Sequence, residues 1–286
     1  AGVYVPLRFD LQLLEAEALR HRDRTEPDEM RALADATAFD RTRPDVALAN
    51  VLAAPGHLAI IGQAGSGKTT VLRLIAAVLA TGDAALAAAQ LGVEGDQPPV
   101  PIYLALRDFE HACQTQPVRY ARDVESLLRF ADDHFVRWHP DCVPDGFLSD
   151  LIRAGRAWLC LDALDEVADF DHRIAVRQVI ESLAGSYAGN RLLVTARVAA
   201  YAGANTRLDH RFAVAHVRDL TRTKYAPLVK RLYAGLESNP GAAAQRANQL
   251  LARIDGSSLL QEMVKTPVLV WTATLIHHAD RALPEQ

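Results

Sequence analysis

The segment that most constrains the fold is the run from Gly62 to Thr69, which reads G-Q-A-G-S-G-K-T. It follows a short apolar stretch, His57 to Ile61, and leads into an apolar segment compatible with a helix. Glycines in such a run permit backbone angles and close approaches that a Cβ would obstruct, so successive N–H groups can converge on phosphate oxygens at a helix N-terminus. The order of strand, loop and helix therefore predicts a phosphate-binding loop in an α/β sheet.

The end of this loop carries the groups that would handle a nucleoside triphosphate. Lys68 offers a mobile positive charge to the β and γ phosphates, and the Thr69 hydroxyl is placed to ligate magnesium. The alternative, a glycine-rich turn that carries Lys-Thr by chance, is disfavoured by the flanking strand and helix. The residues expected to contact the nucleotide are Gly62, Gln63, Ala64, Gly65, Ser66, Gly67, Lys68, Thr69 and Thr70.

Short apolar runs predict a five-stranded parallel sheet. Their continuous hydrophobicity is typical of strands that are buried on both faces, and the helix-compatible stretches between them favour right-handed crossovers. After Leu220 the pattern is helical. We therefore expect a wound α/β fold flanked by helices, with a linker or helical segment at 1–50, a nucleotide-binding domain at 51–220 and a small helical domain at 221–286. The predicted strands are Leu58–Ile61, Val100–Leu106, Trp158–Leu161, Leu192–Thr195 and Phe212–Val217.

Composition excludes several classes of function. The net charge of −4 gives no electrostatic case for binding nucleic acid or membranes. The three cysteines are widely spaced without a C-x-x-C pair, which argues against a disulfide framework or a zinc site and favours a reducing cytoplasm. No apolar run reaches the roughly 18 residues that span a bilayer, and no signal-peptide pattern is present. We expect a soluble cytoplasmic protein, and the chain reads as a piece of a longer polypeptide.

A cluster of acidic residues follows the third predicted strand. In the run A-W-L-C-L-D-A-L-D-E-V, Asp162 comes directly after the strand, and Asp165 and Glu166 come shortly after. Because open α/β sheets bind ligands at the carboxyl ends of their strands, we expect Asp162 to hold magnesium and Asp165 or Glu166 to orient or deprotonate the attacking water. The alternative is that Asp165 and Glu166 only favour the first turn of the next helix.

The fourth predicted strand ends in Thr195-Ala-Arg197. If this strand lies beside the acidic strand, the Arg197 guanidinium is placed to sense or stabilise charge on the γ-phosphate. The alternative is an arginine that is only solvated or ion-paired. The candidate catalytic residues are therefore Asp165, Glu166 and Arg197, and the candidate metal ligands are Thr69 and Asp162.

Taken together, the loop G-Q-A-G-S-G-K-T-T, the run L-D-A-L-D-E-V, the strand L-L-V-T-A-R and the late T-P-V-L-V resemble the NACHT family of signal-transduction P-loop ATPases with numerous domains. The opening segment Tyr4–Arg8 is also similar to the segment before the phosphate loop in bacterial members. The resemblance implies a switch that is closed with ADP and opened by exchange for ATP, with self-association on activation and hydrolysis as a reset.

The resemblance also assigns residues that spacing does not. It places the Arg197 strand between the phosphate-loop strand and the acidic strand, puts Pro267 near the adenine or the phosphates, and lets Val5, Pro6 and Leu7 cover the base. Pro267 has the alternative of only breaking a helix. The chain departs from the family pattern at Ala163, where relatives commonly have glycine, and at Ala196–Val198, where they have Ser-Arg-Pro. The family's winged-helix domain is expected beyond residue 286.

These inferences predict a module that binds ATP and ADP, hydrolyses NTP slowly with Mg²⁺, and controls the opening and oligomerisation of a larger bacterial sensor of immune, anti-phage type. The trigger and the effector are not specified by the sequence. Two alternatives stay open: a nucleotide-dependent assembly scaffold with little hydrolysis, and a housekeeping P-loop ATPase or kinase.

Overall fold

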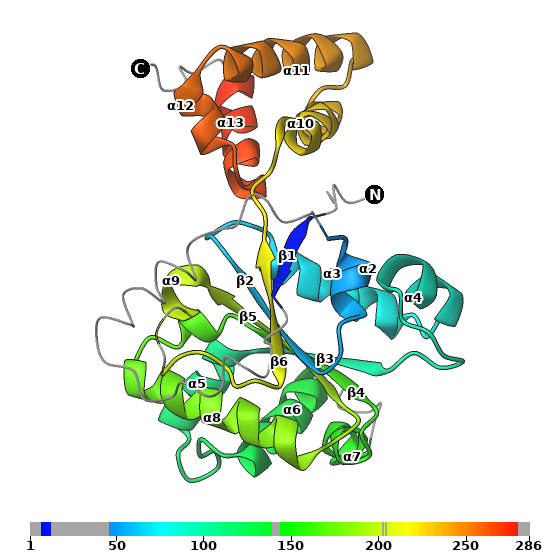
Figure 1. The fold of residues 1–286 in the computed structure, drawn as a ribbon, viewed down its shortest axis with the longest axis vertical. Coiled ribbons are helices and arrows are strands. Elements are labelled where there is room, and N and C mark those ends of the chain that lie inside the picture. The colour runs from blue at the N-terminus through cyan, green and yellow to red at the C-terminus, as the bar shows by residue number, and fades with distance from the viewer. Residues whose placement is uncertain (1–6, 13–45, 139–143, 202, 204, 280–286) are drawn as a thin grey trace. The chain divides into compact units, whose positions relative to one another are not determined.

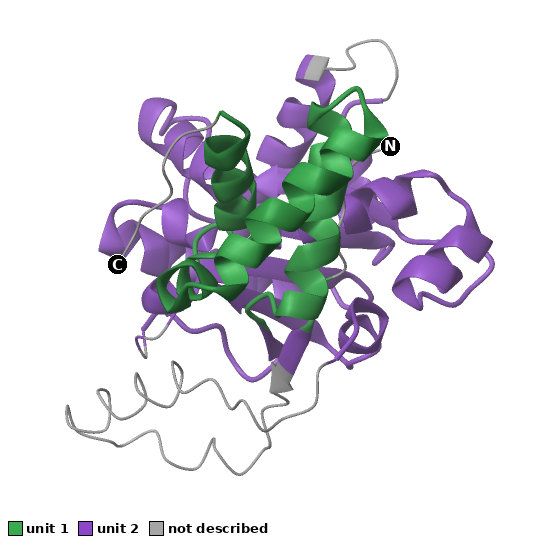
Figure 2. Cartoon of the chain, turned by 90° about the horizontal axis from the view of Figure 1, so that it is seen from above, with its two compact units in different colours: residues 1–8, 63–67, 217–286 green, residues 9–62, 68–216 purple. Residues whose placement is uncertain are grey.

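The structure is a computed structural model that describes residues 7–12, 46–138, 144–201, 203 and 205–279. The chain divides into two compact units, which are described separately here (Figure 2). Unit 2 comprises residues 9–62 and 68–216 and contains the sheet, whereas unit 1 comprises residues 1–8, 63–67 and 217–286 and is mainly helical. The domain boundaries predicted from the sequence stay a prediction.

Within the described residues the sheet has six strands, in the order β1-β6-β2-β5-β4-β3 (Figure 1). The pairings of β2 with β5 and β6, and of β4 with β3 and β5, are parallel. The five predicted strands are all present, but the predicted number of five is wrong because β1 adds a sixth. The strands are β1 Phe9–Gln12, β2 His57–Gly62, β3 Val100–Ala105, β4 Ala157–Asp162, β5 Arg191–Arg197 and β6 Phe212–Val217.

The extra strand escaped the sequence analysis because it is short and polar at its centre. β1 has four residues, F-D-L-Q, and Asp10 interrupts its apolar pattern although this side chain is only 2% exposed. Phe9 also bridges Val46 in antiparallel fashion. A strand of this length at the edge of a sheet shows neither a continuous apolar run nor a clear alternation.

Helices of unit 2 surround the sheet because its strands are apolar on both sides. Residues that alternate along β2, β4 and β5, such as Ile61, Leu161 and Val194, join one core cluster with α5, α6 and α8, while α3 contacts β3, β4 and β5. This arrangement is the wound α/β sheet that the continuous hydrophobicity predicts. The helices are α2 Leu48–Leu52, α3 Lys68–Ala80, α4 Ala84–Leu91, α5 Leu106–Thr115, α6 Val124–Trp138, α7 Phe147–Arg153, the 3₁₀ turn η2 Leu164–Glu166, α8 Phe170–Ser186 and α9 Val198–Tyr201.

The helices of unit 1 pack around a buried polar pair. Tyr233 on one helix and His277 on another are hydrogen-bonded at 2.6 Å, and both are buried. The helices that the sequence predicts after Leu220 are present. Separately, no helix among the described residues is long and apolar enough to cross a membrane. These helices are α10 Arg222–Leu236, α11 Pro240–Asp255, α12 Ser258–Met263 and α13 Pro267–His278.

The register of the sheet brings the candidate site residues to one edge. Gly62, the last residue of β2, lies opposite Arg197, the last residue of β5. Ala105 at the end of β3 lies opposite Asp162 at the end of β4. Because β5 lies between β2 and β4, the strand order expected from the family resemblance is confirmed.

Candidate functional site

Two glycines of the phosphate loop have backbone angles that favour glycine. Gly65 and Gly67 have φ angles of 71° and 97°, in the left-handed region that favours glycine. A Cβ on Gly65 would lie 2.9 Å from the Cβ of Val268, and one on Gly67 would lie 3.0 Å from Cδ1 of Leu7. Within unit 1, both glycines are therefore favoured by backbone angle, and at Gly65 the close Val268 side chain also opposes a Cβ.

Ser66 supplies an unsatisfied polar group inside this loop. Its side chain is 5% exposed, and its Oγ has no hydrogen-bond partner among the described residues. Its backbone N–H donates to the carbonyl of Gln63 at 3.2 Å, which closes the turn. A buried hydroxyl without a partner costs about 1–3 kcal/mol. A phosphate oxygen is an acceptor that would satisfy this group, so the loop fits a polyphosphate.

Two residues that the family resemblance assigns to the nucleotide site, Pro267 and Leu7, lie near the loop within unit 1. Pro267 is the first residue of α13, and its Cγ lies 3.9 Å from the position of a Cβ on Gly67. The Val268 N–H donates to the Gly65 carbonyl at 3.5 Å. Leu7 is 4% exposed against Gly67, whereas Val5 and Pro6 lie outside the described residues. Pro267 therefore both begins a helix and touches the loop.

Lys68 begins α3 in unit 2 and folds back on the strand that precedes the loop. Its Nζ donates to the Gly62 carbonyl at 2.9 Å. Burial lowers the pKa of Lys68, and the charge of Asp165 partly offsets this effect. A lowered lysine pKa means that its surroundings disfavour the positive charge. Bound phosphates would supply negative charge at this group, which is the environment that a phosphate-binding lysine requires.

Asp162, the last residue of β4, is the most heavily hydrogen-bonded acid of the site. Its Oδ1 accepts from the hydroxyls of Thr195 at 2.6 Å and Thr69 at 3.2 Å, and its Oδ2 accepts from the Tyr103 hydroxyl at 2.6 Å. The carboxylate is 5% exposed. Burial and the bond to Asp162 raise the pKa of Tyr103 to about 12, so this phenol remains a donor at neutral pH.

The pair of Thr69 and Asp162 fits a magnesium ion that is also bound by phosphates. Mg²⁺ in nucleotide sites takes one or two carboxylates, and its other ligands come from water and the substrate. The Thr69 hydroxyl and the Asp162 carboxylate, 3.2 Å apart, would supply one ligand each. Both predicted metal ligands lie together in the structure.

A strained turn carries the chain from Asp162 to the other acids. Ala163 has a φ of 60° and a ψ of 60°, and among the described residues no other non-glycine has a positive φ. Its N–H donates to the Thr195 hydroxyl at 2.7 Å. Left-handed backbone costs an L-residue roughly 1–2 kcal/mol. Thr195 thus holds both Asp162 and the turn, which starts the η2 segment that bears Asp165 and Glu166.

Asp165 and Glu166 each pair with an arginine, but the Asp165 side chain is buried and that of Glu166 is partly exposed. Asp165, whose side chain is 7% exposed, accepts from the Arg197 backbone N–H at 3.0 Å and from its Nε at 2.8 Å. Glu166, whose side chain is 36% exposed, pairs with Nη1 of Arg107 at 2.9 Å, and Arg107 is itself 61% exposed. Asp165 is bonded to the end of β5, whereas Glu166 is partly exposed to solvent and its partner is an exposed side chain.

The structure brings together most of the acids and hydroxyls expected from the sequence and adds two residues. Tyr103 and Arg107 were missed. Tyr103 lies on β3, and its role depends on the pairing of β3 with β4, which no local pattern predicts. Arg107 follows the same strand, and its position in the first turn of α5 gave no signal.

One comparison with known proteins finds a family model that covers the phosphate loop and the acidic run. The family model described as NACHT domain matches residues 57–235. The comparison with curated proteins finds no match.

Three solved structures are similar over most of the chain at low identity. A RuvB variant from Thermotoga maritima is 14% identical, with 88% of this chain and 69% of that chain covered and a TM-score of 0.33. A chain of the E. coli MS115-1 HORMA:CdnC:Trip13 complex is 16% identical, with 91% and 84% covered and a TM-score of 0.36. C. elegans PCH-2 is 9% identical, with 89% and 67% covered and a TM-score of 0.36. At these TM-scores the likenesses carry no argument.

Proposed function

Because this chain belongs to the NACHT domain family and is a nucleotide-binding P-loop NTPase, we propose that it is a switch module that binds ATP or ADP with Mg²⁺ and hydrolyses ATP slowly. The observation that carries the proposal is the set of three hydroxyls on Asp162, one of which belongs to Thr69 of the phosphate loop. A buried carboxylate held in this way is preorganised for a magnesium-nucleotide complex. The magnesium ion would neutralise charge on the β and γ phosphates.

Lys68 and the loop would hold the phosphates in place. The loop N–H groups and the Ser66 hydroxyl are donors, and the Lys68 ammonium adds a charge that its surroundings now disfavour. Phosphoryl transfer depends mainly on positioning and charge stabilisation, so these contacts carry much of the binding energy.

Glu166 is the better candidate for the group that accepts a proton from the attacking water. Asp165 accepts a hydrogen bond from the Arg197 backbone N–H and pairs with the Arg197 side chain. Both of its carboxylate oxygens are therefore used to position that arginine. Glu166 has only a partly exposed contact with Arg107, which leaves a carboxylate oxygen available to a water molecule. In this assignment the proton moves from water to Glu166 as the water oxygen attacks the γ-phosphorus, and the bond from the γ-phosphorus to the β–γ bridging oxygen breaks to release ADP and phosphate.

Arg197 would respond to the γ-phosphate. It ends β5 directly opposite Gly62, and its side chain is 55% exposed although it is tied to Asp165. A guanidinium in this place can exchange part of its contact with Asp165 for a phosphate oxygen. Such an exchange would distinguish ATP from ADP, which is the requirement for a nucleotide switch.

We further propose that the switch controls opening and self-association within a larger bacterial sensor of immune, anti-phage type in the cytoplasm. This step is supported by membership of the NACHT family and by the contact of Pro267 and Leu7 with Gly67 in unit 1. Through those contacts, the helical unit touches the loop that would bind phosphate. Comparing the oligomeric state of the full-length protein with ADP and with a non-hydrolysable ATP analogue, by light scattering, tests this step.

Hydrolysis is tested by phosphate release over long incubation with Mg²⁺ and ATP. We expect slow release in the wild type and, in Glu166→Gln, a rate lower by roughly 100-fold. Glu94→Gln serves as a matched control because Glu94 is an exposed acid in the loop before β3. Release from the wild type no faster than from Glu166→Gln would refute the hydrolase and favour the assembly scaffold.

Nucleotide binding is tested separately by calorimetry. Lys68→Ala should weaken ATP and ADP binding by roughly 100-fold or more, because it removes the charge at the phosphates, and the circular dichroism spectrum should be unchanged. Unchanged affinity would refute the assignment of the loop. A kinase, the other alternative, would consume ATP only when an acceptor is added.

A further inference from the structure

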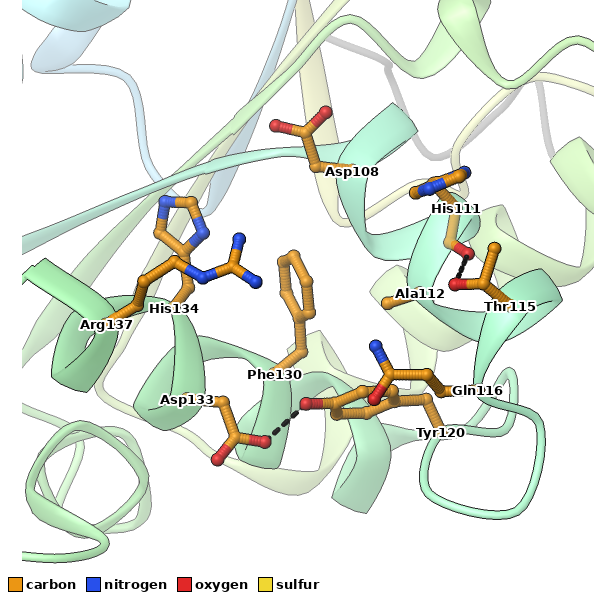
Figure 3. Close-up of a pocket in the computed structure, with 10 residues that line it drawn as sticks. All are labelled: Asp108, His111, Ala112, Thr115, Gln116, Tyr120, Phe130, Asp133, His134 and Arg137. Carbon is orange, nitrogen blue, oxygen red and sulfur yellow. Dashed lines mark hydrogen bonds between the residues drawn. The ribbon is translucent and has the colours of Figure 1, made fainter.

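A cavity of about 460 Å³ lies between α5 and α6, within unit 2 (Figure 3). Its volume is within the range of small-molecule pockets, which is roughly 300–1,000 Å³. None of the residues of the phosphate loop or the acidic run lines it. The lining residues are Asp108, His111, Ala112, Thr115, Gln116, Tyr120, Phe130, Asp133, His134 and Arg137.

An aromatic group forms part of the cavity wall. The Phe130 ring packs against Tyr120 with centroids 6.0 Å apart and against His134 with centroids 5.7 Å apart. On its buried side it meets Phe109 at 5.5 Å. These rings pack at interplanar angles from 33° to 83°, tilted or edge to face, so they hold one another in place and form a fixed aromatic surface. Such a surface favours an aromatic or heteroaromatic ring in the cavity.

The two carboxylates that line the cavity each pair with an arginine that does not line it. Asp133 accepts from Arg119 at 2.7 Å, and also from the Tyr120 hydroxyl, toward which it is turned in Figure 3. Asp108 pairs with Arg107 at 3.3 Å. Asp133 is therefore paired with its own arginine, whereas Asp108 shares Arg107 with Glu166 and its side chain is half exposed.

The cavity lining also includes a positive charge, that of Arg137. Arg137, in the last turn of α6, directs its guanidinium into the space beside Phe130 (Figure 3). Among the described residues it has no carboxylate partner. His111 and His134 add imidazole nitrogens that can donate hydrogen bonds. A guanidinium with this freedom is suited to bind a carboxylate or a phosphate through two parallel bonds.

We propose that this cavity binds a small aromatic anion, in which the ring packs against Phe130 and His134 and the oxyanion pairs with Arg137. The site is distinct from the nucleotide site, and the proposal does not depend on hydrolysis or on nucleotide binding. Its position is nevertheless connected to the acidic run, since Arg107, the partner of Asp108, also pairs with Glu166.

Phenyl phosphate is a suitable probe because it combines one ring with one oxyanion. Titration of the whole chain, followed by NMR of the histidine imidazoles, should shift the signals of His111 and His134, assigned through His111→Gln and His134→Gln. Inorganic phosphate, which lacks the ring, should cause these shifts only at concentrations at least tenfold higher. Absence of shifts at these two histidines with millimolar phenyl phosphate would overturn the proposal.

Three variants separate the cavity from the phosphate loop. Arg137→Gln should weaken phenyl phosphate binding at least tenfold. Arg253→Gln is the matched control, because Arg253 is also an exposed arginine in the last turn of a helix, and it should leave binding unchanged. Lys68→Ala should also leave it unchanged. Binding that is lost in Lys68→Ala, or that persists in Arg137→Gln, would show that the probe occupies another site and would overturn the proposal, whatever the outcome for nucleotide hydrolysis.

Discussion

Asp162 is 5% exposed and accepts hydrogen bonds from three hydroxyl groups, whereas Glu166, four residues later, meets solvent and pairs with one exposed arginine. The first acid ends a strand, where register fixes its neighbours, and the second lies in a short 3₁₀ turn. The difference fits the division of labour that we propose, in which the rigid carboxylate holds magnesium and the more exposed one accepts a proton from water. Asp165 stands between them, tied to Arg197.

The largest expected effect comes from removing the rigid carboxylate. Asp162→Ala leaves the hydroxyls of Tyr103 and Thr195 without their acceptor. It also removes the carboxylate that we propose holds magnesium. We expect turnover to fall on the order of 10³-fold and the free energy of unfolding to fall by about 1–3 kcal/mol. Phosphate release and urea denaturation measure the two effects.

Urea denaturation of a Glu166 variant, compared with that of Asp162→Ala, tests whether the two acids differ in how firmly they are held. Glu166→Gln should reduce turnover with little change in the urea midpoint, because the side chain is partly exposed and its single ion pair is worth less than about 1 kcal/mol. If both variants lose stability equally, the acids do not differ in rigidity, and the division of labour is wrong.

Arg197→Ala is expected to have the next largest effect. It removes the guanidinium that we propose contacts the γ-phosphate, so turnover should fall roughly 100-fold while ADP affinity changes less than about threefold. Calorimetry with ADP and phosphate release with ATP measure the two quantities. An equal loss of both would make Arg197 a ground-state or structural contact through Asp165, and would remove the basis for distinguishing ATP from ADP.

Tyr103→Phe tests whether the third hydroxyl on Asp162 contributes to its rigidity. Only the hydroxyl is lost, since the ring remains against Arg73, whose guanidinium lies 5.6 Å from its centroid. Groups that orient a metal ligand typically change metal affinity or activity by about 10–100-fold when they are removed. We expect an effect near the lower limit, about tenfold, on the Mg²⁺ concentration that gives half-maximal turnover.

Tyr187→Phe is the control for this variant, because the Tyr187 hydroxyl bonds an exposed acid, Glu125, away from the site. The same shift in Mg²⁺ dependence in both variants would mean that loss of any such hydroxyl disturbs the unit, and Tyr103 would have no specific role.

The rigid part of the site was largely predictable, and its supporting residues were not. Gly62–Thr69 and Asp162 are recognisable because local sequence determines them: a loop between strand and helix, and an acid at the end of an apolar run. Tyr103 acts through the pairing of β3 with β4, and Arg107 through the contact of α5 with η2, so both depend on long-range geometry. β1 was missed because a buried Asp10 breaks its pattern.

The smallest predicted effect concerns the turn that separates the two acids. Ala163 adopts a left-handed conformation with φ of 60°, which glycine adopts at much lower cost, so Ala163→Gly should raise the free energy of unfolding by about 0.5–1 kcal/mol. Ala244→Gly is the matched control: Ala244 is exposed within α11, and the same substitution there should lower stability by about 0.5–1 kcal/mol. Urea denaturation distinguishes the signs. Destabilisation in both variants would show that the methyl of Ala163 makes packing contacts worth more than the backbone strain, and the turn would then be part of the rigid region rather than the boundary between a rigid acid and a mobile one.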